Sequence, residues 1–332
     1  MTQPATGRHQ ATGHWRLGLL FSLITMLAWA TLPIALKVAL DYLDPVTLTW
    51  FRFLVAALVL GLWLALGNSM QGYLERVRRA WPLLLLAAAM LTGNYVLYLL
   101  GLGRTSPANA QVLIQLAPML MAMGGLVVFG EHYNRAQWLG FFTLIGGLAV
   151  FFRNQLLNLA QDAHTYMLGV GFMVLAAITW ATYALTQKQL MRDFSSRQIL
   201  LFIYIFAAIA LLPASAPTAL PELSGSQWLW VLYCALNTLI AYGAFGEAMQ
   251  HWEASRVSTV LALTPLGTIG VATLVAAYWP GLVAPERLDI VSISGAVLVV
   301  VGSATTSLAG RPRRRAAPAE PAVVTAPRRH SD

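Results

Sequence analysis

The chain has 332 residues, of which 58% are hydrophobic and 10% are charged, with a formal net charge of +8. So apolar a composition excludes an ordinary water-soluble domain of this length and indicates an integral membrane protein. The lone Cys234 excludes an internal disulfide and a cysteine-based metal cluster, and the basic residues lie in short loops and a tail, which argues against nucleic-acid binding.

A membrane-spanning helix needs roughly 20 mainly apolar residues. In chain order, such runs lie at 17–37, 46–67, 80–102, 108–130, 136–153, 165–188, 197–214, 226–250, 255–279 and 287–308. The sequence therefore predicts an all-α integral membrane protein with ten transmembrane helices. Residues 1–16 form a polar lead, and the basic tail 310–332 is too poor in large apolar residues to fold.

The first apolar run has an alternative interpretation as a cleaved signal peptide. Arg16 precedes it, and Ala28, Trp29 and Ala30 resemble a small-x-small cleavage site. The run continues to Lys37, which favours a retained helix.

One phrase occurs twice in the chain. LAWATLPIALK (27–37) and ITWATYALTQK (178–188) share Trp, Ala, Thr and a closing Lys at an offset of 151. Further equivalent positions follow in order: Tyr95 with Tyr242, Pro118 with Pro265, and Glu131, Gly140 and Gly147 with Glu286, Gly295 and Gly302. Each half then holds five helices, an odd number, so the second half enters the membrane from the opposite side. We therefore predict an inverted-topology repeat with halves at 17–154 and 155–309.

The distribution of basic residues predicts the orientation. Sixteen of the 21 Lys and Arg residues fall on the side that holds the N-terminus, four fall on the other side, and Arg52 lies within a span. Positive charges concentrate in cytoplasmic loops, so both termini are predicted to be cytoplasmic. Lys37 and Lys188 end their helices and are interpreted as interfacial residues.

The chain resembles the drug/metabolite transporter superfamily, in particular its EamA-like ten-helix members. The likeness covers residues 20–308. It rests on the Trp-containing first helix of each half, the Arg of WFRFLVAALVLG, the Pro in the fourth helix of each half, and GEHYNRAQWLGFFTLIGG with its counterpart PERLDIVSISGAVLVVVG. The resemblance implies a bacterial exporter of amino acids or related metabolites with a central cavity. The seventh helix departs from the repeat, because ILLFIYIFAAIAL has no counterpart of Arg52.

The residues themselves also favour transport, because two inverted halves give two conformations that open a shared site to opposite sides. No GxSxG, HExxH, CxxC or acidic dyad lies within the spans, so we expect no enzyme activity, no metal and no cofactor. We expect a small-molecule solute and the lipid bilayer as partners, and a monomer with a dimer as the alternative. A channel and a membrane-embedded enzyme are the remaining alternatives from other classes.

Candidate solute contacts are polar or aromatic side chains within the spans. The set is Trp29, Arg52, Asn94, Tyr95, Tyr98, Gln111, Gln115, Trp180, Tyr242 and Phe245. Aromatic rings can stack on a solute or simply pack, and amides can bind the solute or a neighbouring helix. Arg52 can bind a carboxylate or extend outward to the membrane surface.

Four further candidates concern coupling and helix shape. Glu247 can carry a coupling proton, pair with a solute amine or be solvated at a helix end. Pro33, Pro118 and Pro265 each free a backbone carbonyl, which either faces a polar cavity or accompanies a bend that serves packing. Gly140, Gly146, Gly147, Gly295 and Gly302 are interpreted as sites of close helix packing.

The sequence therefore predicts an inner-membrane metabolite transporter that works by alternating access. The favoured function is export of amino acids, especially apolar or aromatic ones. Efflux of drugs or lipophilic cations, and metabolite uptake, are the alternatives among transporters.

Overall fold

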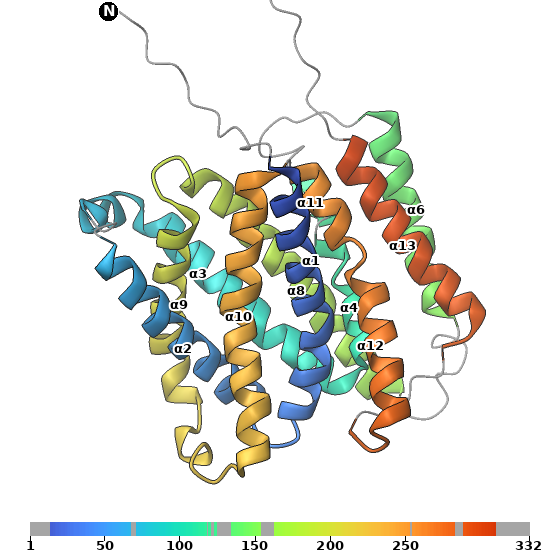
Figure 1. Cartoon of the computed structure of the whole chain (residues 1–332), viewed down its shortest axis with the longest axis horizontal. Helices are drawn as coiled ribbons and strands as arrows, with labels where there is room; N and C mark the ends of the chain where they lie inside the picture. Colours follow the sequence, from blue (N-terminus) through green and yellow to red (C-terminus); the bar gives the residue numbers. More distant parts are fainter. Residues whose placement is uncertain are drawn as a thin grey trace, which may run out of the picture.

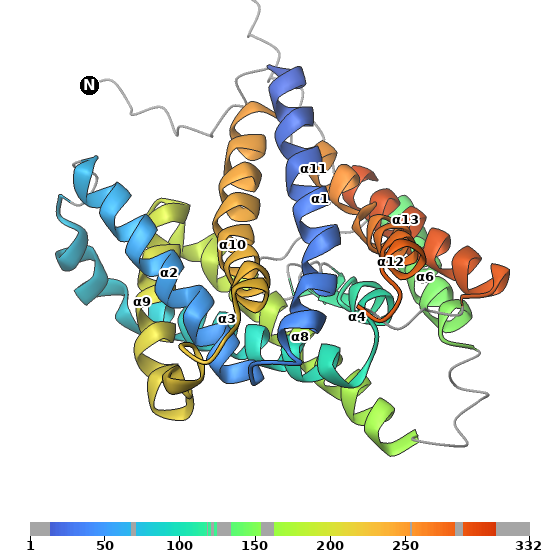
Figure 2. The same cartoon turned by 60° about the horizontal axis from the view of Figure 1, so that its bottom comes forward.

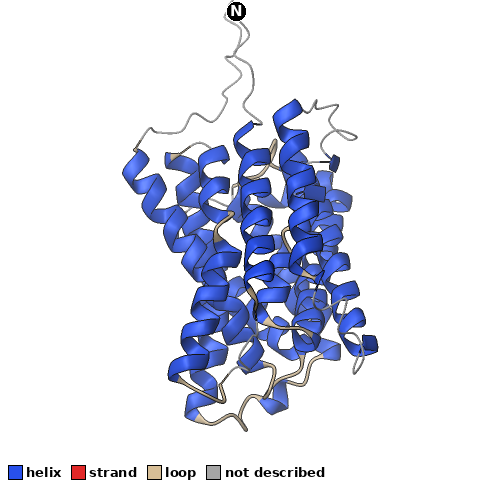
Figure 3. Cartoon of the chain, turned by 90° about the vertical axis from the view of Figure 1, so that its right-hand side faces the viewer, coloured by secondary structure: helices blue, strands red, loops and turns tan. Residues whose placement is uncertain are grey.

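The computed structural model describes residues 14–67, 71–117, 119–120, 123–124, 134–153, 163–252, 254–282 and 288–309. Within these ranges the chain consists of helices and loops (Figure 3). The helices are α1 (Trp15–Ala39), α2 (Pro45–Leu66), α3 (Tyr73–Arg104), α4 (Pro107–Leu113), α6 (Arg135–Phe151), α8 (Ala163–Leu190), α9 (Ser196–Leu211), η1 (Leu212–Ala214), η2 (Pro217–Ala219), α10 (Gly225–His251), α11 (Ala254–Leu261), α12 (Thr264–Tyr278) and α13 (Ile290–Ala309). The predicted all-α fold is confirmed for these residues.

Seven helical stretches in the described ranges are long and apolar enough to cross a membrane. They are Trp15–Ala39, Pro45–Leu66, Tyr73–Arg104, His164–Gln187, Ser196–Ala214, Gly225–Ala248 and Thr259–Tyr278. Two shorter apolar helices, Arg135–Phe151 and Ile290–Thr306, accompany them. These stretches coincide with nine of the predicted spans, and the tenth, 108–130, is described only in part. Pro118, Glu131, Glu286 and the tail 310–332 lie outside the described residues.

Polar caps define where several helices begin. The Asp44 carboxylate accepts hydrogen bonds from the backbone N–H groups of Val46 and Thr47 at 2.9 and 3.0 Å, with Pro45 in the first position of α2. Reciprocal capping boxes begin three other helices: Asn134 with Gln137, Ser195 with Gln198, and Ser224 with Gln227. Each cap satisfies backbone donors that the first helical turn leaves unpaired.

Helix α3 begins earlier than the predicted span at 80–102. Gly72 precedes it with a φ of 63°, a left-handed conformation that glycine adopts without strain. No helix-breaking residue follows before Ala80, so the polar segment Tyr73–Arg79 continues the helix beyond the apolar run.

The ninth predicted span, 255–279, is two helices instead of one. α11 ends at Leu261, residues 262 and 263 form a turn, and α12 starts at Thr264. Pro265, in the first turn of α12, has no N–H to continue the earlier helix. The fourth span shows a similar interruption, because α4 ends at Leu113 and residues 114 and 115 form a turn.

Helices α6 and α13 pack closely and antiparallel through glycines. A Cβ atom added to Gly140 would lie 2.8 Å from the Gly302 carbonyl oxygen, and one added to Gly147 would lie 2.9 Å from the Gly295 carbonyl oxygen. Residue numbers therefore rise along α6 as they fall along α13. Gly146 was also predicted to serve close packing, but that prediction is wrong, because a Cβ there would meet nothing within 4 Å.

Helices α2 and α9 also contact each other in antiparallel fashion. The indole N–H of Trp50 donates to the Ala208 carbonyl at 3.0 Å, and the rings of Phe53 and Tyr204 lie 5.6 Å apart. Near the other end of α2, the guanidinium of Arg197 lies 4.3 Å from the ring centroid of Trp63. Figures 1 and 2 show α2 and α9 on one side of the bundle and α6 and α13 on the other.

Helices α1 and α10 lie side by side at the centre of Figure 2, and α3 packs along α8. Figure 1 shows that α1 begins and α13 ends at the upper end of the bundle. In the same view, α6 ends and α8 begins toward the lower end. The start of α1 and the end of α13 therefore lie at the opposite end of the bundle from the end of α6 and the start of α8.

Candidate functional site

Arg52 in α2 is the one charged side chain that is buried among the described residues, with 3% of its surface exposed. Its Nε and Nη2 atoms donate to the Thr238 hydroxyl oxygen at 3.2 and 3.1 Å. Thr238 lies at the midpoint of α10 (Gly225–His251). The guanidinium therefore points into the bundle at mid-depth and does not extend outward to a membrane surface.

An aromatic ring lies against this guanidinium and begins a chain of ring contacts. Its Cζ atom lies 4.8 Å from the ring centroid of Tyr95 in α3, a cation–π contact. Tyr95 is buried and its ring lies 4.6 Å from that of Phe53. The Tyr95 and Tyr242 hydroxyl groups lie close enough to form a hydrogen-bonded pair, which connects α3 with α10.

The aromatic contacts continue from Tyr242 into α1. The Trp29 ring lies 5.8 Å from Tyr242 and 5.9 Å from Phe245, and all three are half-buried. We call the connected set of Arg52, Thr238, Tyr95, Tyr242, Trp29 and Phe245 the Arg52 cluster. It brings five of the predicted site residues together from four helices.

Two other predicted residues lie next to this cluster in different roles. Trp180 packs against the apolar core that contains Tyr95, Tyr183 and Tyr204. Asn94 is buried, and its side-chain amide donates to the Ala176 carbonyl at 2.8 Å. Asn94 therefore joins α3 to α8, as expected of an amide that binds a neighbouring helix.

Gln111 and Gln115 lie at the interruption of the fourth predicted span. The Tyr98 hydroxyl donates to Gln111 Oε1 at 3.2 Å. Gln115 lies in the turn after α4 and is 9% exposed, and its buried Nε2 atom has no hydrogen-bond partner among the residues that the structure describes. A buried amide donor without an acceptor is costly, so this group is available to an incoming acceptor.

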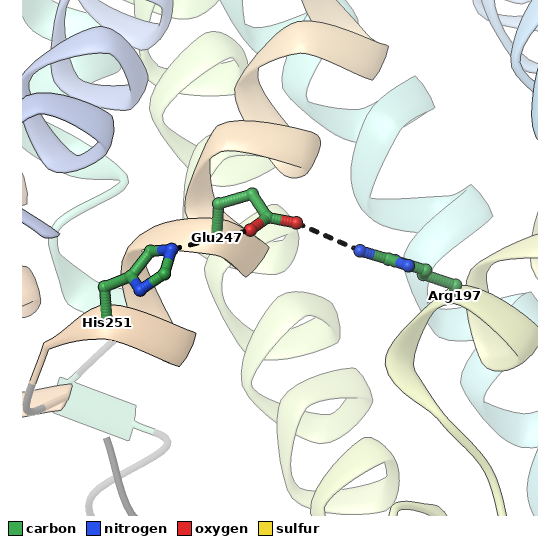
Figure 4. A network of polar contacts seen from close by, with 3 residues as sticks. All are labelled: Arg197, Glu247 and His251. Carbon is green, nitrogen blue, oxygen red and sulfur yellow. Dashed lines mark hydrogen bonds and ion pairs between the residues drawn. The ribbon is translucent and has the colours of Figure 1, made fainter. Parts of the chain in front are cut away.

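Glu247, the predicted coupling residue, forms an ion pair with Arg197 and lies near His251 (Figure 4). Arg197 Nη2 donates to Glu247 Oε1 at 3.0 Å, and His251 Nε2 lies 3.9 Å from Glu247 Oε2. The Glu247 and Arg197 side chains are 35% and 44% exposed. No group of three or more His, Cys, Asp or Glu side chains in the described ranges is placed to hold a metal ion.

The three candidate prolines differ in their surroundings. Pro33 is buried inside the uninterrupted α1. Pro265 leaves the Leu261 carbonyl without its helical donor, but the Thr264 hydroxyl donates to that oxygen at 2.5 Å. That carbonyl is thus satisfied within the protein. Pro118 lies outside the described residues.

Sequence reasoning missed two polar contacts. The Thr238 hydroxyl accepts hydrogen bonds from Arg52. The sequence feature that could have indicated this contact is the pair of polar residues Asn237 and Thr238 inside the apolar run 226–250. Lys37 was interpreted as interfacial, yet its ammonium group donates to the carbonyls of Leu102, Gly103 and Thr105 at 2.9, 2.9 and 2.8 Å. Lys37 therefore ties α1 to the carboxyl end of α3, where helix carbonyls lack partners.

The family profile described as "EamA-like transporter family" matches the chain twice, at residues 16–153 and 167–308. The chain belongs to the EamA-like transporter family. It is therefore a membrane transporter with several apolar spanning helices.

Relatives of this transporter have similar lengths. The "Uncharacterized inner membrane transporter YhbE" of Escherichia coli is 36% identical over 296 residues, covering 89% of this chain and 92% of that protein. An "Uncharacterized transporter" of Haemophilus influenzae is 35% identical over 292 residues, covering 88% and 95%. The similarity to these relatives, together with the apolar helices, identifies the protein as an inner-membrane transporter.

More distant matches add a named activity and a fold. A "Probable amino-acid metabolite efflux pump" of Salmonella typhimurium is 26% identical over 311 residues, covering 89% of this chain and 96% of that protein. One solved crystal structure has 20% sequence identity and a TM-score of 0.59, covering 88% and 96%. At this identity, the likeness shows a shared fold.

Proposed function

We propose that the transporter is built from two inverted five-helix repeats, residues 17–154 and 155–309, with both termini in the cytoplasm. The antiparallel contacts of α6 with α13 and of α2 with α9 support this, because each pair consists of corresponding helices. A two-fold axis in the membrane plane reverses helix direction, whereas an axis along the membrane normal preserves it. The contact between Tyr95 and Tyr242 fits positions beside such an axis.

Two hydrogen bonds occupy equivalent positions and support the same proposal. Asn94 in α3 donates to the Ala176 carbonyl in α8, and Thr25 in α1 donates to the Ala241 carbonyl in α10 at 3.4 Å. The repeat offsets place Thr25 on Ala176 and Asn94 on Ala241. The pair of α3 and α8 and the pair of α1 and α10 are thus joined at equivalent positions. The donor is Asn94 in α3 in the first pair, whereas in the second pair it is Thr25 in α1, the counterpart of α8.

This architecture supports alternating access as the mechanism. The halves have similar sequences and opposite orientations, so exchanging their local conformations exchanges the side on which the shared site is open. A solute held between the halves is then exposed to one face of the membrane at a time. We assign solute binding to the Arg52 cluster, which lies where α1, α2, α3 and α10 meet.

The proposed activity is export of amino acids or related small metabolites, with apolar or aromatic side chains favoured. The observation that carries it is the buried Arg52 guanidinium, which contacts the Tyr95 ring and the Thr238 hydroxyl at the midpoint of α10. A guanidinium binds carboxylates through a planar fork, and aromatic rings bind apolar side chains. The distant relatives named as amino-acid metabolite efflux pumps support the same class.

Cysteine labelling tests the architecture. In a Cys234→Ala background, Asn158→Cys probes the junction of the halves and Ser331→Cys probes the C-terminus. We expect a membrane-impermeant thiol reagent to label Asn158→Cys in intact cells and Ser331→Cys only after permeabilisation. Labelling of both positions from the same side would contradict the inverted repeat.

Exchange in proteoliposomes tests the activity. We expect liposomes loaded with unlabelled phenylalanine or leucine to accumulate labelled phenylalanine, with saturation and with loss of exchange in Arg52→Ala. Equal exchange of unrelated sugars would refute the proposed site chemistry. Resistance to lipophilic cations on expression, unchanged by Arg52→Ala, would indicate drug efflux instead.

A further inference from the structure

The Arg52 guanidinium retains hydrogen-bonding capacity that the protein does not use. Arginine carries five N–H donors. Two of them, on Nε and Nη2, are directed to Thr238, and the other three have no acceptor in the part of the chain that the structure describes. At 3% exposure, water cannot freely replace those partners.

Among the residues that the structure describes, no carboxylate pairs with this charge. The acidic residues inside predicted spans are Glu247 and Asp289. Asp289 accepts from the backbone N–H of Ser292 at 2.8 Å at the start of α13, and Glu247 pairs with Arg197. Glu247 also lies nine residues after Thr238 in α10, roughly 13 Å along the helix axis. Arg52 is therefore a buried cation with no anion beside it in the described ranges.

Several donors of the candidate site residues lack an acceptor in the described part of the chain. They are three N–H groups of Arg52 and the buried Nε2 amide of Gln115. Asn237 has an unpaired acceptor, Oδ1, but its amide nitrogen donates to the Ala28 carbonyl at 2.9 Å, which places Asn237 in the contact between α10 and α1. Thr238, Tyr242 and Phe245 follow at helical spacing on a different face of α10.

From this donor-rich, positively charged setting we propose that the transporter recognises its solute as a carboxylate anion whose remainder carries no positive charge. This inference rests on the proposed function and narrows its substrate class from amino acids and related metabolites to those derivatives that lack the ammonium group, with free amino acids as weaker solutes. The carboxylate binds the free N–H groups of Arg52, and an apolar or aromatic body packs on Trp29, Tyr242 and Phe245. Carboxylates of this class include N-acylated amino acids and their deaminated counterparts.

A free ammonium group on the solute is unfavourable in this setting. It would lie near the Arg52 charge with no carboxylate to receive it. At a separation of about 6 Å and an effective dielectric constant of about 20, two positive charges weaken binding on the order of 100-fold. In a zwitterion the solute's own carboxylate screens part of this repulsion, so we expect a smaller penalty, about 10-fold.

Competition in proteoliposomes tests the inference with four compounds that share one ring. They are 3-phenylpropionate and N-acetylphenylalanine, which are anions, phenylalanine, which is a zwitterion, and phenethylamine, which is a cation. We expect each anion to inhibit exchange of labelled phenylalanine at concentrations about 10-fold below those of unlabelled phenylalanine. Phenethylamine is expected to require concentrations at least 100-fold above those of the anions.

Two results would overturn the inference in different ways. Phenylalanine exchange that phenethylamine inhibits as well as 3-phenylpropionate does would refute anion recognition and leave the transport proposal standing. Stronger inhibition by phenylalanine than by both anions would do the same, because the ammonium group would then contribute to binding. Absence of saturable exchange with all four compounds would refute the proposed solute class and this inference together.

Variants separate recognition by Arg52 from a structural role. Arg52→Gln is expected to reduce the preference for 3-phenylpropionate over phenethylamine at least 10-fold, and Arg52→Lys to keep the preference with weaker inhibition by all anions. Arg79→Gln removes an exposed arginine that pairs with Glu75, and it serves as the matched control with unchanged preference. An Arg52→Gln protein that stays monodisperse and keeps the full preference would refute the role of Arg52. If that variant does not fold, Arg52→Lys and the wild-type preference still decide the matter.

Discussion

The contact between α6 and α13 makes a sharp prediction about two adjacent glycines. A Cβ atom at Gly147 would lie 2.6 Å from the Val299 nitrogen, whereas ordinary van der Waals contact begins at 3.4 Å. Gly147→Ala must therefore separate the two helices locally by about 0.8 Å. Forced expansion of a packed contact typically costs about 1–3 kcal/mol. Gly146 faces open space, so Gly146→Ala adds a methyl group without a clash.

Thermal unfolding of the purified variants in one detergent measures the difference. At roughly 2–4 °C per kcal/mol for a chain of this size or somewhat smaller, we expect Gly147→Ala to lower the midpoint by about 3–10 °C. Gly146→Ala is expected to leave it unchanged or raise it slightly, because alanine favours helix more than glycine does. Gly295→Ala and Gly302→Ala should behave like Gly147→Ala. Equal midpoints for Gly146→Ala and Gly147→Ala would refute the close antiparallel contact.

Substitutions of two other side chains are predicted to change stability by different amounts, a large loss at Lys37 and a small change at Glu247. Lys37→Met removes three charge-assisted hydrogen bonds to the end of α3 and should cost about 2–3 kcal/mol in thermal or denaturant unfolding. Arg104→Met loses one exposed bond to the Leu100 carbonyl and a cation–π contact with Phe172, and it should cost less. The reverse order would contradict the capping role. Glu247→Gln breaks a half-exposed ion pair with Arg197 and should change stability by at most about 1 kcal/mol while exchange continues, with Glu75→Gln as the surface control. Loss of exchange in Glu247→Gln at unchanged stability would instead assign Glu247 to coupling.

Much of the fold follows from the sequence because lipid imposes simple rules. Length and hydropathy locate the helices, since each span must bury about 20 residues and bond its own backbone. The Ser, Asn and Asp caps explain why α2, α6, α9 and α10 begin where they do. The early start of α3 was not predicted, because the polar residues 73–79 extend the helix outside the apolar run and carry no membrane signal.

The site was harder to predict, since sequence order gives no distances between helices. The residue type and position of Arg52 allowed both an inward and an outward side chain, and only the neighbouring Thr238 and Tyr95 decide between them. Gly146 and Gly147 are identical residues one position apart, yet one faces α13 and the other does not. Asn94 and Glu247 looked available from the sequence because their partners, Ala176 and Arg197, are distant along the chain.

The pairing of Tyr95 with Tyr242 has a consequence for the energetics of the proposed cycle. Tyr95 and Tyr242 occupy equivalent positions in the two halves. Interchanging the halves therefore exchanges the two tyrosines and leaves the pair unchanged. Its contribution to the inward-open state then equals its contribution to the outward-open state. Removing both hydroxyl groups, as in the double variant Tyr95→Phe and Tyr242→Phe, should slow transport equally in each direction. Any directional bias must then come from unmatched residues such as Arg52.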